Sequence, residues 1–218
     1  MATVDARTEI LANLRRALNA SQKAPAPEVP RNYRMEGSDA PGSDAVIAEL
    51  KEKLEDYTAQ VEIVSDDEIT DTIARFLEPL TSVVVPAGLP DAWKEAAAKD
   101  GRKVVEDSRE SGLSNYELNE IDAVVTASRV AISLSGTIVL DGEADQGRRA
   151  ITLVPDTHVI VLKAEDIYPT VPQAVAVLNE NPCRPITWIA GPSATSDIEL
   201  VRVDGVHGPR NLRVIIVK

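Results

Sequence analysis

The feature that most constrains this fold is a regular alternation of short β-branched runs with helical segments, which begins at Ser43. Apolar residues at helical spacing mark some of the helices. Two others begin at capping boxes, in which a serine is followed by a glutamate three residues later. Four buried-type strands are expected at residues 61–64, 82–85, 103–105 and 123–126. Such alternation predicts an α/β fold, in which helices flank a mostly parallel, open sheet.

The second half of the chain is richer in predicted strands. Runs of apolar and β-branched residues place further strands at 136–140, 159–162, 186–190 and 212–217, with one helix near 172–179 among them. The chain has 218 residues and no internal repeat. This length suits one large domain with an appendage.

The appendage is predicted at the N-terminus. Apolar residues recur there at helical spacing, which indicates an amphipathic helix, and three closely spaced prolines then favour an extended linker. We therefore expect a tethered helix and Pro-rich linker over residues 1–42 and a folded domain over 43–218. The helix is free to pack on its own domain, on another subunit of a homo-oligomer, or on a partner protein.

Charge and composition exclude several classes of protein. The net charge of −12 argues against a nucleic-acid-binding protein, which needs a basic face to neutralise phosphates. No stretch approaches the roughly 20 apolar residues of a membrane span. Cys183 is the only cysteine, so the chain forms no internal disulfide and cannot ligate an iron–sulfur cluster by itself. These observations predict a cytoplasmic protein.

Polar side chains gather near the C-terminus, between two Gly-Pro turns at residues 191–192 and 208–209. Backbone rich in Gly and Ser lets several N–H groups converge on an anion. His207 suits proton transfer near neutral pH, and Asp197 either orients a histidine or caps a helix. We assign His207 and Asp197 as candidate catalytic residues. The candidate ligand-binding residues of this segment are Gly191, Ser193, Thr195 and Gly208.

Three further loops carry candidate ligand-binding residues. Ser135, Gly136 and Thr137 form either a ligand contact or a tight turn before a strand. Arg148 or Arg149 either binds a carboxylate or phosphate through its planar fork or belongs to a solvated pair at a loop end, and we assign Arg149 as the candidate. His158, at the start of a predicted strand, either contacts a ligand or is structural. The sequence contains no GxGxxG or P-loop motif, and its histidine spacing predicts no metal site.

Several of these motifs carry a resemblance to a known family. Five motifs occur in the same order as in the LutC-type lactate utilisation proteins, which consist of a LUD domain. They are DAVVT from Asp122, ISLSGTIVL from Ile132, RAITLVP from Arg149 to Pro155, before His158, and GPSATSDIE and GVHGP near the C-terminus. The similarity is clearest from Asp122 to the C-terminus. One departure is Leu134, which stands where that family has an acid.

The resemblance implies a fold of the NagB/RpiA/CoA transferase-like group, in which ligands bind at the carboxyl ends of strands. It also implies a subunit of a cytosolic system that oxidises L-lactate to pyruvate with iron–sulfur partner proteins, which carry the cofactors that this chain lacks. Two alternatives remain open. One is an independent enzyme of that fold acting on a small anionic metabolite, although Leu134 counts against covalent carboxylate chemistry. The other is a non-catalytic module that binds such a metabolite. Whether the chain catalyses a reaction alone is left open.

Overall fold

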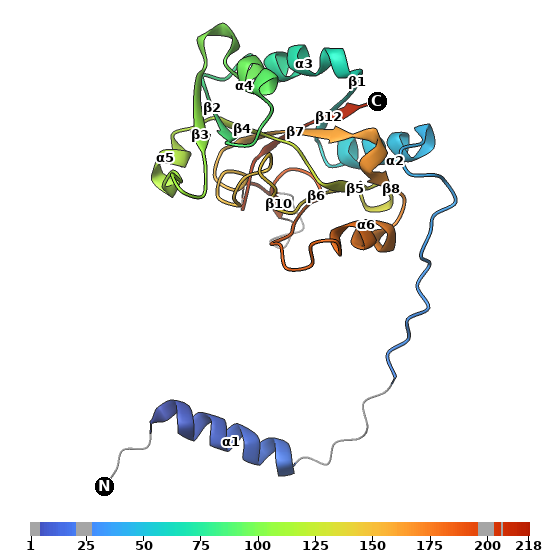
Figure 1. The fold of residues 1–218 in the computed structure, drawn as a ribbon, viewed down its shortest axis with the longest axis vertical. Helices are drawn as coiled ribbons and strands as arrows, with labels where there is room; N and C mark the ends of the chain where they lie inside the picture. The colour runs from blue at the N-terminus through green and yellow to red at the C-terminus, as the bar shows by residue number, and fades with distance from the viewer. Residues whose placement is uncertain (1–4, 21–27, 196–202, 206) are drawn as a thin grey trace. The chain divides into compact units, whose positions relative to one another are not determined.

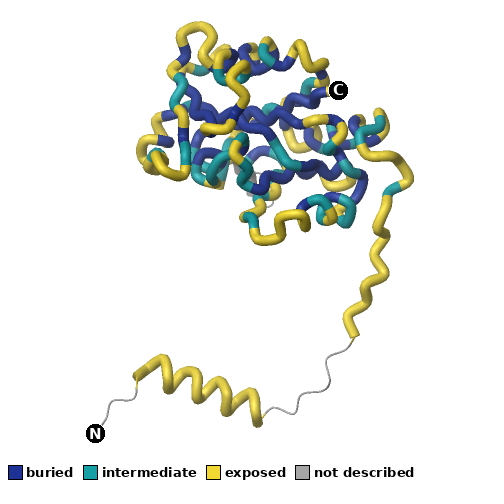
Figure 2. The backbone as a smooth tube through the Cα atoms, viewed as in Figure 1, coloured by how far each residue is buried: buried dark blue, intermediate teal, exposed yellow. Residues whose placement is uncertain are grey.

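The computed structural model describes residues 5–20, 28–195, 203–205 and 207–218. Contacts divide the chain into two units, residues 1–33 and 34–218. The first unit contains helix α1 (Ala6–Ala20), in which every residue is exposed (Figure 2). No helix in the described ranges has both the length and the apolar character needed to cross a membrane. The second unit is called the body below.

The body is built on a six-stranded sheet in which every neighbouring pair is parallel (Figure 1). This confirms the predicted α/β class and the mostly parallel sheet. In spatial order its strands are β1 (Gln60–Val64), β12 (Asn211–Val217), β7 (Thr157–Lys163), β4 (Ala123–Thr126), β2 (Ser82–Pro86) and β3 (Lys103–Asp107).

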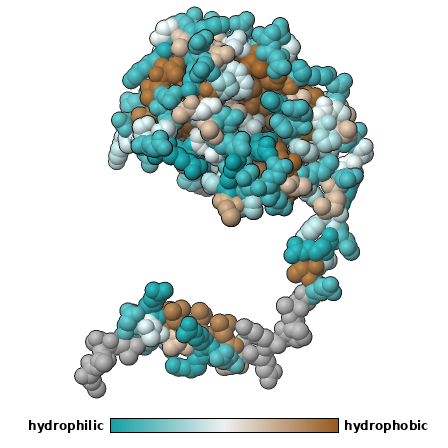
Figure 3. All heavy atoms as spheres, in the orientation of Figure 1, coloured by the Kyte–Doolittle hydropathy of each residue, from teal (hydrophilic) through white to brown (hydrophobic). Residues whose placement is uncertain are grey.

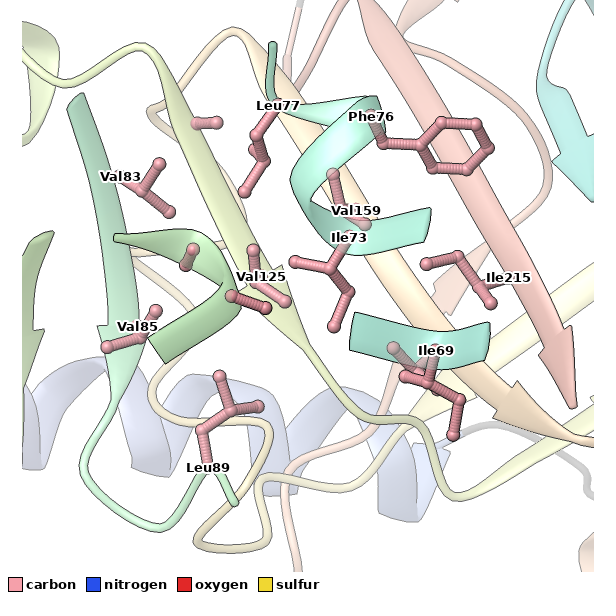
Figure 4. Close-up of a cluster of buried hydrophobic side chains, with 14 of the residues drawn as sticks. Ile69, Ile73, Phe76, Leu77, Val83, Val85, Leu89, Val125, Val159 and Ile215 are labelled. Atoms are coloured by element: carbon pink, nitrogen blue, oxygen red, sulfur yellow. The ribbon is translucent and has the colours of Figure 1, made fainter. Parts of the chain in front are cut away.

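Helices cover both faces of this sheet, and the side chains of each strand alternate between them. On one face, α3 (Ile69–Phe76) and α4 (Asp91–Ala97) pack on the sheet, and Ile73 of α3 lies among strand residues that include Val125 and Val159 (Figure 4). On the other face, α2 (Asp44–Asp56) packs against residues that include Ile160. Strands buried on both sides must be apolar throughout, which explains their continuous β-branched runs.

A second sheet of four strands packs on the α2 side of the body. Its other face is covered by α6 (Val171–Leu178), which contacts residues such as Ile132 and Val139. Strand β5 is antiparallel to β6 and parallel to β8, and β6 is antiparallel to β9. In spatial order the strands are β8 (Ile167–Tyr168), β5 (Val130–Ile132), β6 (Thr137–Leu140) and β9 (Thr187–Ile189).

Both predicted capping boxes are present. The backbone N–H of Ser65 donates to Glu68 Oε2 at 2.9 Å before α3, across the short helix η1 (Asp66–Glu68). The backbone N–H of Ser114 donates to Glu117 Oε2 at 2.8 Å at the start of α5 (Asn115–Asn119). In each box the hydrogen bonds from serine lower the pKa of the glutamate. These local contacts fix where two helices begin.

Asp122 ties the amino ends of β2 and β4 together. Its Oδ2 accepts hydrogen bonds from the backbone and hydroxyl groups of Thr81 and Ser82, at 2.8–3.0 Å. Burial raises the pKa of this carboxyl, but the hydrogen bonds from Thr81 and Ser82 together outweigh it, so the pKa lies below its usual value. The charged carboxylate of Asp122 therefore links the amino ends of β2 and β4.

The segment before α2, residues 34–42, forms hydrogen bonds with other elements of the body. The Gly37 N–H donates to Gln173 Oε1 at 3.3 Å, and the Gly42 N–H donates to the carbonyl of Ile167 at 3.0 Å. Residues 34–42, which the sequence assigns to the linker, therefore contact α6 and β8. The remaining short elements of the body are η2 (Lys99–Gly101), η3 (Ser133–Ser135), η4 (Ala164–Asp166), β10 (Ala194–Thr195) and β11 (Val203–Asp204).

Candidate functional site

A small cavity of about 120 Å³ lies near the amino ends of β7 and β12. Its apolar walls include Trp188 and Leu212, and Thr152 adds a hydroxyl group. It brings together residues from three segments that are far apart in the sequence. The predicted site residues that line it are Arg149, His158, Gly191, Ser193, His207 and Gly208.

His158 is the buried polar group of this cavity. It is 1% exposed and lies inside β7, one residue beyond the first strand position, rather than before the strand. Its Nε2 is 2.8 Å from the hydroxyl oxygen of Thr126. Burial, reinforced by the positive charge of Arg149, lowers the pKa of His158 to about 3. The imidazole is therefore neutral at physiological pH, with one nitrogen that donates and one that accepts.

Arg149 supplies positive charge beside that neutral ring. Its Nη1 donates to the Thr152 hydroxyl at 3.0 Å, and no carboxylate within the described ranges forms an ion pair with it. Partial burial lowers the pKa of Arg149. A guanidinium stays charged at neutral pH despite such a shift, so Arg149 is available to an anionic ligand.

Arg148, its neighbour in sequence, is engaged elsewhere. Its Nε and Nη2 donate to the two oxygens of Asp107, each at 2.7 Å, and Nη2 also donates to the carbonyl of Leu113. The Asp107 side chain is fully buried. Of the two arginines proposed from sequence, Arg148 is therefore structural, and Arg149 faces the cavity.

The C-terminal loop closes one side of the cavity. Ser193 joins its two ends, because its N–H donates to the Pro209 carbonyl at 2.8 Å and its Oγ accepts from the His207 N–H at 2.9 Å. Gly191 and Gly208 have φ values of +99° and +121°, which favour glycine. Short strands β10 and β11 pair antiparallel within the loop.

The remaining predicted residues of this loop are Thr195 and Asp197. Thr195 is the second residue of β10, and its backbone lies opposite Val203. Asp197 lies outside the described residues. Its pairing with a histidine therefore stays a prediction, and His207 is exposed at the rim of the cavity.

Ser135 and Gly136 lie in the turn between β5 and β6, and Thr137 is the first residue of β6; none of the three lines the described part of the cavity. Gly136 has a φ of +61°, and a Cβ there would be 2.7 Å from the Cβ of Lys53 in α2. The Ser135 hydroxyl donates to Thr137 Oγ1 at 2.9 Å. Close packing against α2 thus accounts for the glycine. Leu134, in the same turn, is 62% exposed.

A larger cavity of about 860 Å³ lies at the carboxyl ends of β2 and β3. Its lining includes Asp145, whose pKa is raised mainly by burial and then by the charge of Glu143. A third cavity, of about 360 Å³, shares Arg148 with the large cavity and Arg149 with the small one. The resemblance to the NagB/RpiA/CoA transferase-like group predicts a ligand site at the carboxyl ends of the strands. Most of the predicted site residues instead lie near the amino ends of β7 and β12.

Sequence reasoning missed several residues of both cavities. Thr126 and Thr152 lie within the motifs DAVVT and RAITLVP, but neither was assigned a role, because their contacts with His158 and Arg149 exist only in the folded chain. Asp107 could have been found, because a charged residue at the end of a buried strand often lines the crevice of such a sheet. No group of three His, Cys, Asp or Glu side chains suited to a metal ion occurs in the part of the chain that is described.

Comparison with known proteins agrees with the resemblance carried by the motifs. The LUD domain family matches residues 47–217. Lactate utilization protein C of Deinococcus radiodurans is 42% identical, over 99% of this chain and 97% of its own length. Lactate utilization protein C of Bacillus subtilis is 31% identical over 60% of this chain and 57% of its own. The crystal structure of a DUF162 family protein from Deinococcus radiodurans superposes with a TM-score of 0.67 and 38% identity, covering 80% of this chain and 97% of that one. The chain therefore belongs to the LUD domain family.

Proposed function

We propose that this chain is a LutC-type subunit of a cytoplasmic system that oxidises L-lactate to pyruvate. Its role is to bind the organic acid, while iron–sulfur partner proteins accept the electrons. The process is supported by the likeness to Lactate utilization protein C, which extends over 99% of this chain. The role of the subunit rests on one observation, the guanidinium of Arg149 at a small cavity.

The chemistry of the cavity suits a small 2-hydroxy or 2-oxo acid. Arg149 offers a charge-assisted bidentate contact to the carboxylate. The neutral ring of His158 offers a hydrogen bond to a hydroxyl or carbonyl oxygen, and Trp188 and Leu212 provide apolar surface for a methyl group. The volume of about 120 Å³ is below the roughly 300–1,000 Å³ of most ligand pockets, which favours a ligand of few atoms.

Oxidation of lactate removes two electrons and two protons, so the reaction needs an electron acceptor. Iron–sulfur clusters are usually held by four cysteines, and this sequence has one. The single cysteine supports the proposal that any such clusters are held by partner proteins. Binding by this chain and electron transfer by its partners together make a complete reaction.

The role in lactate oxidation is tested by lactate-dependent dye reduction in extracts of the source organism, with the gene deleted and then restored. Wild type is expected to restore activity. Arg149→Ala is expected to restore little. Arg75→Ala is the matched control, because Arg75 lies on helix α3 and pairs with Glu62 of strand β1, away from the cavity lining. Full activity in the deletion strain, with no redundant lactate dehydrogenase present, would contradict the proposal.

The binding role is tested on the purified chain by calorimetry. L-lactate and pyruvate are expected to bind, and the uncharged analogue lactamide is not. Arg149→Ala is expected to weaken lactate binding by about 10- to 100-fold, because it removes a hydrogen bond to a charged group. Turnover of a metabolite by the isolated chain would instead support an independent enzyme.

A further inference from the structure

Helix α1 carries an exposed apolar face. Ile10, Leu14 and Leu18 follow one another at helical spacing and are 45–66% exposed, with Leu11 beside them. Figure 3 shows these apolar side chains along one side of the helix. A helix of 15 residues is marginally stable by itself in water. Its stability as a helix therefore calls for a surface that buries this face.

The body presents a groove with the complementary character. It lies beside α2 and the edge strand β1 and has a volume of about 540 Å³. Its apolar floor includes Ala48 and Ile63, and Ile63 is 44% exposed. The lining of the groove carries four acidic side chains and two lysines. The lysines pair with two of the acids, Lys51 with Glu55 and Lys218 with Asp44. Glu52 and Asp56 form no ion pair with any residue that the structure describes, so the groove has a net negative charge.

The two units carry net charges of opposite sign. Residues 1–33 hold five Lys and Arg against three Asp and Glu, whereas residues 34–218 hold 18 against 32. On α1, Arg7 continues the apolar face one turn earlier and Arg15 borders it, while Glu9 lies on the opposite side. The face that would be buried is thus bordered by positive charge, and the groove is bordered by negative charge.

We propose that α1 of one chain docks in the α2–β1 groove of a second copy of the same chain. The apolar face of α1 covers Ile63 and Ala48, and Arg7 and Arg15 lie against the acidic rim. Two arms and two grooves satisfy each other reciprocally, which gives a closed, two-fold dimer. The proposal is independent of the proposed function, since neither α1 nor the groove contributes to the cavity at His158.

The linker allows α1 to reach a second copy of the chain. Thirteen residues, 21–33, separate α1 from the body, and they include Pro25, Pro27 and Pro30. Pro-rich sequences favour extended spacers of about 3.1 Å per residue, so a sequence of this length has a maximum reach of roughly 40 Å. Such a reach is long enough for α1 of one chain to meet the groove of a second copy.

Cross-linking tests the exchange directly. In a Cys183→Ser background, one chain carries Ala17→Cys in α1 and another carries Ala48→Cys in the groove, so any disulfide must join two chains. Mixing them is expected to give a cross-linked species of twice the 23.5 kDa chain. Tyr116→Cys, at a residue 89% exposed on α5, replaces Ala48→Cys as the control. A yield of cross-linked dimer no higher than in this control would overturn the proposal. A single chain that carries both Ala17→Cys and Ala48→Cys and closes an internal disulfide would also overturn it.

Light scattering on the full-length protein provides the second test. Wild type is expected to have the mass of a dimer, and Leu14→Asp and Ile63→Asp are each expected to have the mass of a monomer. Val29→Asp, in the linker, is the control and should leave the dimer intact. Arg15→Glu is expected to weaken association about threefold to tenfold, and Glu52→Arg in the same chain is expected to restore it. A monomeric wild type, or a dimer that persists in Leu14→Asp, would overturn the proposal.

Discussion

Arg149 and His158 face one cavity and respond differently to burial. Arginine keeps its charge because its pKa is so high that partial desolvation does not remove it. Histidine loses its charge because its ordinary pKa is near 6.5, and burial beside Arg149 lowers it to about 3. Among the described residues that line the cavity, Arg149 therefore supplies a fixed positive charge at neutral pH. That is the charge that a monocarboxylate requires.

The buried histidine predicts a pH effect on stability. Its folded-state pKa lies below the unfolded value, so between pH 6.5 and about 3 the unfolded state binds a proton that the folded state does not. Stability falls as pH is lowered through this window. His158→Gln, which keeps a hydrogen-bonding group, should remove about 2–3 kcal/mol of the loss between pH 7.5 and 4.5. Urea unfolding of both proteins at several pH values measures it, and parallel curves would contradict the prediction.

The two adjacent arginines predict opposite phenotypes. Arg148→Ala leaves the buried carboxylate of Asp107 without its cation and should lower the free energy of unfolding by about 3 kcal/mol. Arg149→Ala removes no ion pair formed within the described ranges and should change that free energy by less than about 0.5 kcal/mol, while weakening ligand binding. Urea unfolding of the two variants distinguishes them, and equal destabilisation would be evidence against the assigned roles.

At the scale of elements, Asp122 predicts how β2 and β4 are held. Its pKa is lowered in the folded state, so its stabilising effect is present above the unfolded pKa near 3.9 and is lost as pH falls through the lower, folded value. Asp122→Asn should cost about 1–3 kcal/mol at neutral pH. Thermal unfolding tests this. Asp56→Asn serves as the control, because Asp56 is exposed and forms no ion pair with a described residue. An equal loss of stability in this control would argue that Asp122 does not link β2 and β4.

The elements that sequence predicted are those with a strong local signal. Strand β2 contains three consecutive buried valines, and α5 begins at a capping box formed within four residues. The three-residue strand β5 was missed because it is too short for periodicity and is defined by its partners β6 and β8. A strand whose stability comes from distant pairing leaves little trace in its own residues.

At the scale of the whole molecule, the acidic excess predicts what the protein does not bind. A net charge of −12 repels phosphates, so the full chain should show no binding to duplex DNA at physiological salt. Fluorescence anisotropy of a labelled duplex measures this. Binding that weakens steeply with added salt would show that the basic N-terminal unit acts separately from the acidic body.

The candidate site was predictable in its residue types and less so in its assembly. Gly191, Ser193 and His207 come from one polar loop, and Arg149 and His158 come from two others, so sequence supplied candidates for the cavity. It did not supply their environment. The hydroxyl partner of His158 lies 32 residues away, and the burial that keeps the ring neutral exists only after the sheet has formed.

The pairing of β1 with β12 has a consequence for biosynthesis. Residues 60–64 align with residues 213–217, and β12 also separates β1 from β7. A ribosome adds about 5–20 residues per second from the N-terminus, so the place for β12 stays empty until residues 211–217 have been synthesised. Until then the nascent chain exposes two unpaired strand edges and lacks Leu212, one wall of the cavity. A translation product truncated before β12 would be a substrate for chaperones and proteases rather than a weakened form of the folded protein.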